Sequence, residues 1–471
     1  MKENIPKQGK LVPSLGLLSA CLLVISSIVG SGVFKKVAPM SVELQSPIWV
    51  LIALLLAGMI SLFGALSNAE IAGLLADSGG EYVYYRKIYN KLFAFLYGWA
   101  SFTAIRSASI ASVAYVFAQS FNNLFTLPHL SESLEKISIF GFFYPLDNLG
   151  VKALAIFLIL FLTFINYRGL KLGEKLNNSV TLIVVFCILG IIIMGLTIGD
   201  GNWQNIFSHT KKFDSLSGID FTKSLFVAML SAFWAFEGWS SVGYVGGEIK
   251  NPQKNIPMAL GIGVFFVIIL YVMVNYTYLF VLPINEMIEV GKTKNSVAAL
   301  VVVKHFLSNP GVIFVSILIL ISTFGCTNST ILMASRLYYK MSNDGLFFKS
   351  ANFIHPRFNT PSFSLFIQAI WTSILVLSGS FDQLTDMLIF ASFIFYGTTT
   401  LGVFILRYKM PNTPRPYKVV GYPIIPAIFI IFCLMLIGIT LISRTGEALV
   451  GLILILTGLP FYFYWNRKNK V

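Results

Sequence analysis

Long apolar runs separated by short polar connections dominate the chain. A membrane-spanning helix needs about 20 consecutive, mostly apolar residues. Twelve runs approach or exceed that length, which predicts an all-α membrane protein with about twelve transmembrane helices. They lie near residues 14–42, 46–76, 92–125, 151–167, 176–198, 221–248, 256–283, 298–338, 361–379, 383–408, 420–442 and 446–465.

The first apolar run is interrupted at its centre, where residues 26–34 read SSIVGSGVF. Glycine is a weak helix former, and serine competes locally for backbone hydrogen bonds. In lipid, a break is tolerated only where protein or a wet cavity satisfies the freed backbone groups. A half-helix starting near Ser31 would point unpaired N–H groups and a positive dipole end into the gap. The pattern therefore predicts a binding site for a carboxylate.

The sixth run carries a second interruption, where residues 233–241 read FWAFEGWSS. A carboxylate at the bilayer centre costs about 2.5–3.5 kcal/mol on insertion scales. Glu237 is therefore expected to face a partner or a wet cavity. Arg106 within the third run also needs a partner, and Glu237 is a candidate. The alternative is an ion pair with only a structural role.

The two interrupted runs open two blocks of five spans. Broken helices in corresponding positions of two halves are typical of inverted-repeat transporters. We predict a five-plus-five inverted repeat with helices 1 and 6 unwound. The expected divisions are a cytoplasmic segment at 1–13, a first repeat at 14–200, a second repeat at 201–410, and helices 11 and 12 with a cytoplasmic tail at 411–471.

Charge and composition agree with this topology. The chain is 56% hydrophobic and 11% charged, with a net charge of +14, whereas soluble domains carry about 25% charged residues. With the N-terminus inside, 22 of the 34 Lys and Arg residues fall in inside segments and 11 in outside segments. This excess predicts cytoplasmic termini. The charges are scattered through short loops, which argues against a nucleic-acid partner.

No motif in the sequence indicates catalysis or metal binding. The four cysteines lie inside predicted spans without a CxxC spacing, and neither HExxH nor GxSxG occurs. We expect no enzyme activity, no cofactor, no metal and no disulfide framework.

Small polar residues line one face of the eighth span. Ser322, Thr323, Cys326, Thr327 and Thr330 follow spacings of three and four. Either they provide oxygen ligands for a Na⁺ between helices 1 and 8, or they allow close helix packing. The face is generic, which favours packing.

Several sequence runs together resemble the amino acid–polyamine–organocation superfamily, in particular its L-type amino acid transporter branch. Each run is weak alone, but they follow the family's order over nearly the whole chain. They are GSGVF at 30–34, SGGEYVY at 78–84, AFEGW at 235–239, EIKNP at 248–252, SRLYY at 335–339, RPYK at 415–418 and GYPIIP at 421–426.

This resemblance implies alternating access, with an amino acid bound at the midplane. By position, the N–H groups of Ser31, Gly32 and Val33 would bind the α-carboxylate. The carbonyls of Ile28, Trp234 and Glu237 would accept from the α-ammonium. Ala235, in the same stretch as Trp234 and Glu237, is also expected to bind the substrate. Trp234 would close the site from outside, the alternative being a core or interfacial tryptophan.

The chain also departs from the family. The family usually has a Lys in helix 5, whereas residues 176–199 contain none, and Thr181 or Asn178 is a candidate to occupy that space. Lys35 and Lys36 follow the first break, either as a replacement charge or in the outer vestibule. Animal members pair with a heavy chain through an outside cysteine, which is missing here, so no disulfide-linked heavy chain is expected.

The resulting hypothesis is a prokaryotic inner-membrane exchanger of neutral L-amino acids. A H⁺- or Na⁺-coupled symporter of amino acids or polyamines is one alternative. A polyamine has no carboxylate for Ser31 and Gly32, and no acidic cluster is visible to bind it. The other alternative is a receptor that keeps the fold without turnover.

Overall fold

The computed structural model describes residues 13–138, 144–293, 296–378 and 381–468. Within these residues the secondary structure is helical apart from two isolated β-bridges. In the described part of the chain, ten helices are long and apolar enough to cross a membrane, and α1 and α17 are shorter apolar helices. Together they account for the twelve predicted spans, so the protein is a multi-pass helical membrane protein.

The first block of five spans contains the following helices. The first span is α1 (Leu17–Ile28), α2 (Gly32–Lys35) and α3 (Val37–Leu44), and the second is α4 (Pro47–Leu74). After α5 (Glu81–Ile88), the third span joins α6 (Lys91–Ala100), the π-helix η1 (Ser101–Ile105) and α7 (Arg106–Leu124). The short α8 (Glu132–Glu135) leads to α9 (Leu149–Tyr167) and α10 (Leu170–Thr197).

The second block begins after α11 (Trp203–Phe207) and α12 (Lys211–Ser215). Its first span is α13 (Gly218–Phe236) with the 3₁₀ turns η2 (Trp239–Tyr244) and η3 (Gly246–Glu248). It continues with α14 (Pro252–Val281), α15 (Ile284–Lys292), α16 (Ala298–Asn343), η4 (Lys349–Asn352), α17 (Ser362–Ser378) and α18 (Phe381–Lys409). The last spans are α19 (Ile424–Ser443), and α20 (Thr445–Leu456) with α21 (Gly458–Lys468).

The eighth span differs from its sequence-based prediction. Within α16, Ser308 has the non-helical angles φ 52° and ψ −145°, and Pro310 follows it. Proline lacks an N–H and clashes with the carbonyl of the residue four positions earlier, so it kinks or breaks a helix at the preceding turn. Residues 298–307 therefore form a separate helix before the span, and the expected single helix over 298–338 is wrong at its start.

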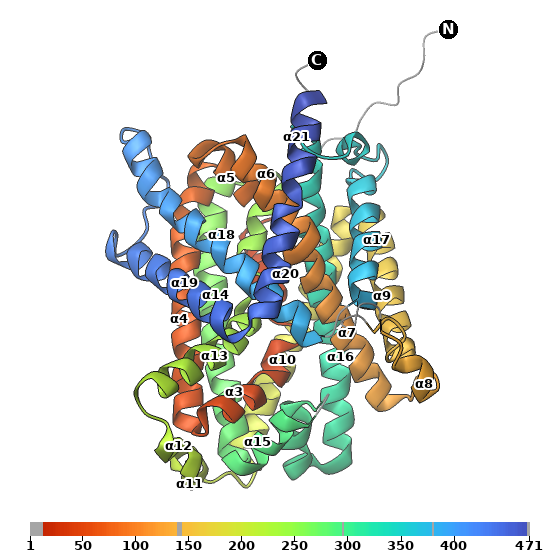
Figure 1. The fold of residues 1–471 in the computed structure, drawn as a ribbon, viewed down its shortest axis with the longest axis vertical. Coiled ribbons are helices and arrows are strands. Elements are labelled where there is room, and N and C mark those ends of the chain that lie inside the picture. Colours follow the sequence, from red (N-terminus) through yellow and green to blue (C-terminus); the bar gives the residue numbers. More distant parts are fainter. Residues whose placement is uncertain (1–12, 139–143, 294–295, 379–380, 469–471) are drawn as a thin grey trace.

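Corresponding spans of the two blocks pack against each other. The second span α4 lies along the seventh, α14, and the third span's α7 lies along the eighth, α16. The fourth span α9 packs against the ninth, α17, and α1 packs against η2 of the sixth. Four of the five spans of the first block thus contact the span five positions later, which agrees with a five-plus-five repeat. In Figure 1, α5, α6 and α21 gather at one end of the molecule, and α11, α12 and α15 at the other.

Candidate functional site

The first predicted break is present between α1 and α2. The helix ends at Ile28, Val29 leaves helical geometry with ψ 82°, and α2 begins at Gly32 without a side-chain cap. Among the described residues, the N–H groups of Ser31, Gly32 and Val33 have no hydrogen-bond acceptor. The buried Ser31 hydroxyl has no partner there either. The break thus presents a cluster of donors in the protein interior.

The second break follows Phe236. Glu237 is extended, with φ −66° and ψ 148°, and Gly238 has φ 110° in the left-handed region that glycine adopts without strain. A Cβ at position 238 would lie 2.3 Å from the Ser27 carbonyl oxygen. The Ser27 hydroxyl donates to the Gly238 carbonyl over 3.1 Å. The two unwound segments therefore touch each other directly.

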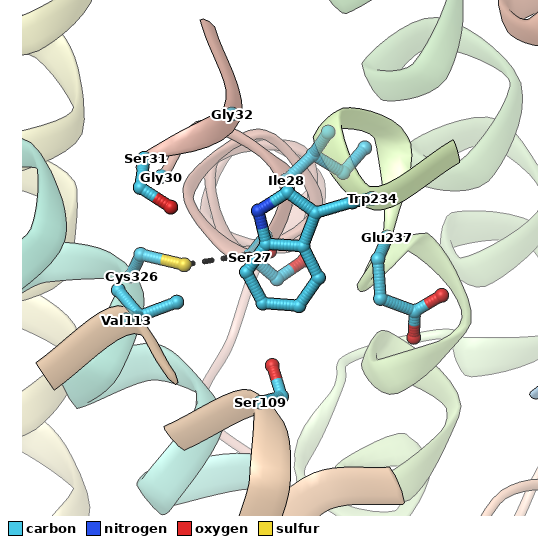
Figure 2. A pocket seen from close by; sticks show the side chains of 10 residues that line it. All are labelled: Ser27, Ile28, Gly30, Ser31, Gly32, Ser109, Val113, Trp234, Glu237 and Cys326. Carbon is cyan, nitrogen blue, oxygen red and sulfur yellow. Dashed lines mark hydrogen bonds between the residues drawn. The ribbon is translucent and has the colours of Figure 1, made fainter. Parts of the chain in front are cut away.

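A pocket lies between the two breaks. Figure 2 shows the Trp234 indole across its middle, between Cys326 and Glu237, with the Ser109 hydroxyl pointing up from α7. The space in the pocket that is open to a water-sized molecule measures about 10 Å³, which is about what one water molecule needs. The site is therefore closed around Trp234. The lining residues are Ser27, Ile28, Gly30, Ser31, Gly32, Ser109, Val113, Trp234, Glu237 and Cys326.

The carbonyl groups expected to meet an ammonium group are partly occupied. The Ile28 carbonyl accepts from the Tyr271 hydroxyl over 3.0 Å and from the Gly30 N–H over 2.8 Å. The Trp234 carbonyl accepts from the Glu237 N–H over 3.2 Å. A carbonyl oxygen has two lone pairs and can accept a second hydrogen bond. These roles stay predictions.

Gly32 and Ala235 bring the two broken helices into backbone contact. A Cβ built on Gly32 would lie 2.5 Å from the Ala235 Cα and 2.7 Å from its Cβ. Carbon atoms normally approach to about 3.5–4.0 Å. Only glycine allows this approach, which places the free N–H groups of α2 beside α13.

Arg106 and Glu237 meet at the edge of the pocket, although 131 positions separate them in the sequence. The Arg106 Nη1 lies 3.2 Å from the Glu237 Oε1, and both side chains are buried. The same carboxylate oxygen accepts from the Tyr396 hydroxyl over 2.8 Å. The Arg106 Nε donates to the Tyr244 hydroxyl and its Nη2 to the Ser240 hydroxyl, over 3.2 and 3.1 Å. The ion pair is thus held by neutral donors and acceptors on both sides.

The fifth span, α10, approaches the first break through a residue that the sequence did not single out. The Ser26 hydroxyl donates to the Asn177 Oδ1 over 2.6 Å, whereas the Thr181 hydroxyl bonds to a carbonyl of its own helix. Asn178 lies further out and donates to the Ser19 hydroxyl over 3.3 Å. Asn177 is therefore the residue of α10 that reaches the unwound region. A role for Thr181 in coupling stays a prediction.

On α16, Ser322 contacts the first break and Thr323 does not. The Ser322 hydroxyl donates to the Val29 carbonyl over 3.0 Å, and the Thr323 hydroxyl bonds to the Ile319 carbonyl over 2.6 Å within its own helix. Past the break, the Lys35 Nζ donates to the Gln119 Oε1 over 3.5 Å. Lys36 is buried, with 6% of its surface exposed.

Two pocket residues on α7 were missed by the sequence reasoning. Ser109 and Val113 lie three and seven positions after Arg106. Residues at spacings of three, four and seven share a helix face. Because Arg106 had been placed near Glu237, this spacing could have identified both residues. Cys326 was noted only as a cysteine inside a span.

Comparison with known proteins places this site in a family. Residues 15–459 match the family described as amino acid permease. The serine/threonine exchanger SteT of Bacillus subtilis is 31% identical over 458 residues, covering 97% of each chain. The b(0,+)-type amino acid transporter 1 of Homo sapiens is 30% identical over 471 residues, covering 98% of this chain and 90% of that protein. The large neutral amino acids transporter small subunit 2 of Homo sapiens is 29% identical over 465 residues, covering 97% and 81%.

The match extends across both breaks and every described span except the end of the last. Two interrupted helices, a pocket between them and free N–H groups at the first break accompany this similarity. The chain therefore belongs to the amino acid permease family, within the amino acid–polyamine–organocation superfamily.

Proposed function

We propose that this protein exchanges neutral L-amino acids across the membrane by alternating access. The observation that carries the proposal is the cluster of unpartnered N–H groups at Ser31, Gly32 and Val33 beside the pocket. Helix N-terminal N–H groups favour a carboxylate, and unwound carbonyls favour an ammonium group. An α-amino acid carries both groups on neighbouring atoms.

The charges around the pocket favour a neutral side chain. Arg106 and Glu237 neutralise each other at 3.2 Å, so neither offers an unopposed charge to the substrate. The remaining side chains beside Trp234 are small or uncharged, including Ser109, Val113 and Cys326. A second substrate charge would have to be buried without a partner, which is costly.

The pocket's size favours small substrates. The Trp234 indole lies across the pocket, and only about 10 Å³ is open to a water-sized molecule. The indole has to swing aside, and the helices have to separate, before an amino acid enters. Glycine, alanine, serine and threonine require the smallest movement. The relative SteT is named a serine/threonine exchanger, which agrees with a small polar substrate.

The proposed setting is a plasma or inner membrane, with both termini in the cytoplasm and the repeats at 14–200 and 201–410. The excess of Lys and Arg in the assigned inside segments supports this orientation. We propose that the protein works without a disulfide-linked heavy chain, because its four cysteines all lie in predicted spans.

Counterflow in proteoliposomes tests the exchange. Labelled serine is added outside to vesicles that contain unlabelled serine or no amino acid. We expect rapid uptake only into the loaded vesicles. Uptake into empty vesicles that needs a Na⁺ or H⁺ gradient would indicate a symporter. Binding of serine without uptake under any loading would indicate a receptor.

A further inference from the structure

Among the described residues, four glutamates are more than nine-tenths buried, and one of them has no arginine partner. Three pairs form, Glu70–Arg407, Glu237–Arg106 and Glu248–Arg336, with closest distances of 2.7, 3.2 and 2.8 Å. The fourth, Glu81, is 1% exposed. No described Lys or Arg side chain forms an ion pair with it. An isolated carboxylate is costly to bury in its charged form.

Glu81 receives hydrogen bonds from neutral groups only. It is the first residue of α5, and the Asn68 Nδ2 donates to its Oε1 over 3.2 Å. The Tyr97 hydroxyl donates to its Oε2, also over 3.2 Å. These distances lie at the long end of the usual range. Burial raises the pKa of the Glu81 carboxyl, while the Arg106 charge and the N–H groups of the first turn act in the opposite direction.

The same hydrogen-bond network leads from Glu81 to the candidate substrate site. The Tyr97 and Tyr244 hydroxyls are hydrogen-bonded to each other. The Tyr244 hydroxyl accepts from Arg106, which pairs with Glu237 at the pocket. The chain of groups contains two carboxylates and one guanidinium. If both carboxylates were ionised, one negative charge would remain uncompensated in the protein interior.

Asp77, four positions before Glu81, pairs with Lys340 of α16 over 2.7 Å, so these two charges offset each other. Arg106 is the charged side chain that faces Glu81, and tyrosines are neutral near pH 7. The titratable groups that interact with Glu81 are Tyr84 and Tyr85 of α5, Tyr97 of α6, Arg106 of α7, Tyr244 of η2 and Tyr396 of α18.

Glu81 directly follows a short segment that contacts the sixth span. The Gly79 N–H donates to the Tyr244 carbonyl over 3.1 Å, and Ser78 forms a β-bridge with Val245. These contacts join the segment before α5 to the unwound part of the sixth span. In Figure 1, α5 lies at the same end as α21. Separating the sixth span from this segment would bring water to Glu81.

We propose that Glu81 is a proton-binding site, and that its proton stabilises the conformation closed at the α5 end. Opening that end hydrates the carboxyl group and releases the proton, and closing it takes a proton up again. The proton enters and leaves at one end only, so it regulates exchange without crossing the membrane. This inference rests on the proposed exchange.

The pH dependence of serine counterflow tests the inference. The pH is varied from about 5 to about 9, equal on both sides, which covers the raised pKa values known for buried carboxyl groups. A raised pKa means that closure is stabilised below that pKa and weakened above it. We expect wild-type exchange to fall by up to about tenfold per pH unit above the midpoint. A rate that stays constant over the whole range overturns the proposal.

Three variants separate Glu81 from other groups. Glu81→Gln imitates the protonated state, so its exchange should stay near the wild-type maximum at every pH. Tyr97→Phe removes a donor to the charged form and should move the midpoint to higher pH by up to about one unit. Glu174→Gln changes a half-buried carboxyl group on α10 and should keep the wild-type profile.

The outcomes distinguish the two proposals. If exchange in Glu81→Gln depends on pH with the wild-type midpoint, proton binding at Glu81 is overturned. If Glu81→Gln does not fold, a wild-type midpoint in Tyr97→Phe overturns it. Failure of the wild-type protein to exchange at any pH contradicts the proposed function. In that case the infrared band of protonated carboxyl groups still decides the inference. The wild-type band should lose intensity in Glu81→Gln at the acidic end of the pH range, where the raised pKa keeps the carboxyl group protonated, and an unchanged band there would contradict the assignment.

Discussion

Replacing Gly32 with alanine tests the arrangement of the two broken helices most directly. The added Cβ would lie 2.5 Å from the Ala235 Cα and 2.7 Å from the Ala235 Cβ. An ordinary carbon contact is about 3.5–4.0 Å. The two segments would have to move apart by roughly 1 Å, because a backbone atom cannot rotate out of the way as a long side chain can.

That movement would displace the donors at Ser31, Gly32 and Val33 from a bound carboxylate. One hydrogen bond to a charged group contributes about 1.5–3 kcal/mol, so its loss weakens binding by about 10- to 150-fold. We expect Gly32→Ala to bind serine at least about tenfold more weakly and to lose most of its exchange. Gly32→Val should be more severe, since it adds two methyl groups at the same contact.

Binding of labelled serine to purified protein and counterflow in proteoliposomes provide the two readouts. Gly190→Ala is the matched control, because no atom lies within 4 Å of a Cβ built at that position in α10. It should bind and exchange like the wild-type protein. Adding Ala235→Gly to Gly32→Ala should restore little, since the Ala235 Cα itself is the closest atom. Wild-type affinity and exchange in folded Gly32→Ala would refute the assignment of the carboxylate site.

Three further predictions concern the pocket and its surroundings. Trp234→Ala should enlarge the pocket and shift its preference toward larger neutral substrates. Leucine should then compete with labelled serine better than it does in the wild-type protein. Unchanged competition would argue against Trp234 as the lid. Arg106→Gln should leave the Glu237 carboxylate buried without its partner and destabilise the protein by about 3–5 kcal/mol. In thermal unfolding, the double variant Arg106→Gln, Glu237→Gln should be more stable than Arg106→Gln alone. A double variant that is less stable than Arg106→Gln would contradict a paired charge. Ser322→Ala should leave exchange equal in Na⁺ and K⁺ media, as in the wild-type protein, because the Ser322 hydroxyl donates to the Val29 carbonyl. If wild-type exchange depends on Na⁺ and this variant loses that dependence, the residue would instead belong to a cation site.

The location of the site was visible in local composition. Lipid leaves few ways to satisfy free backbone groups, so glycines and serines in one apolar run and Glu237 with Gly238 in another indicated two breaks. Both breaks occur where the sequence predicted them. The start of the eighth span was harder to place, because residues 298–307 are apolar enough to continue a span, and the conformation of Ser308 ends that helix.

The sequence by itself determined the membrane-spanning character, the order of the spans and the two interruptions, because these depend on the composition of short continuous stretches. Tertiary structure decided which side chains meet. Neighbouring residues of a helix point about 100° apart, so only the packed rotation of α10 selects Asn177 over Asn178. In the same way, the packing of the helices brings Arg106 and Glu237 together as an ion pair, whereas Glu81 is hydrogen-bonded by neutral side chains.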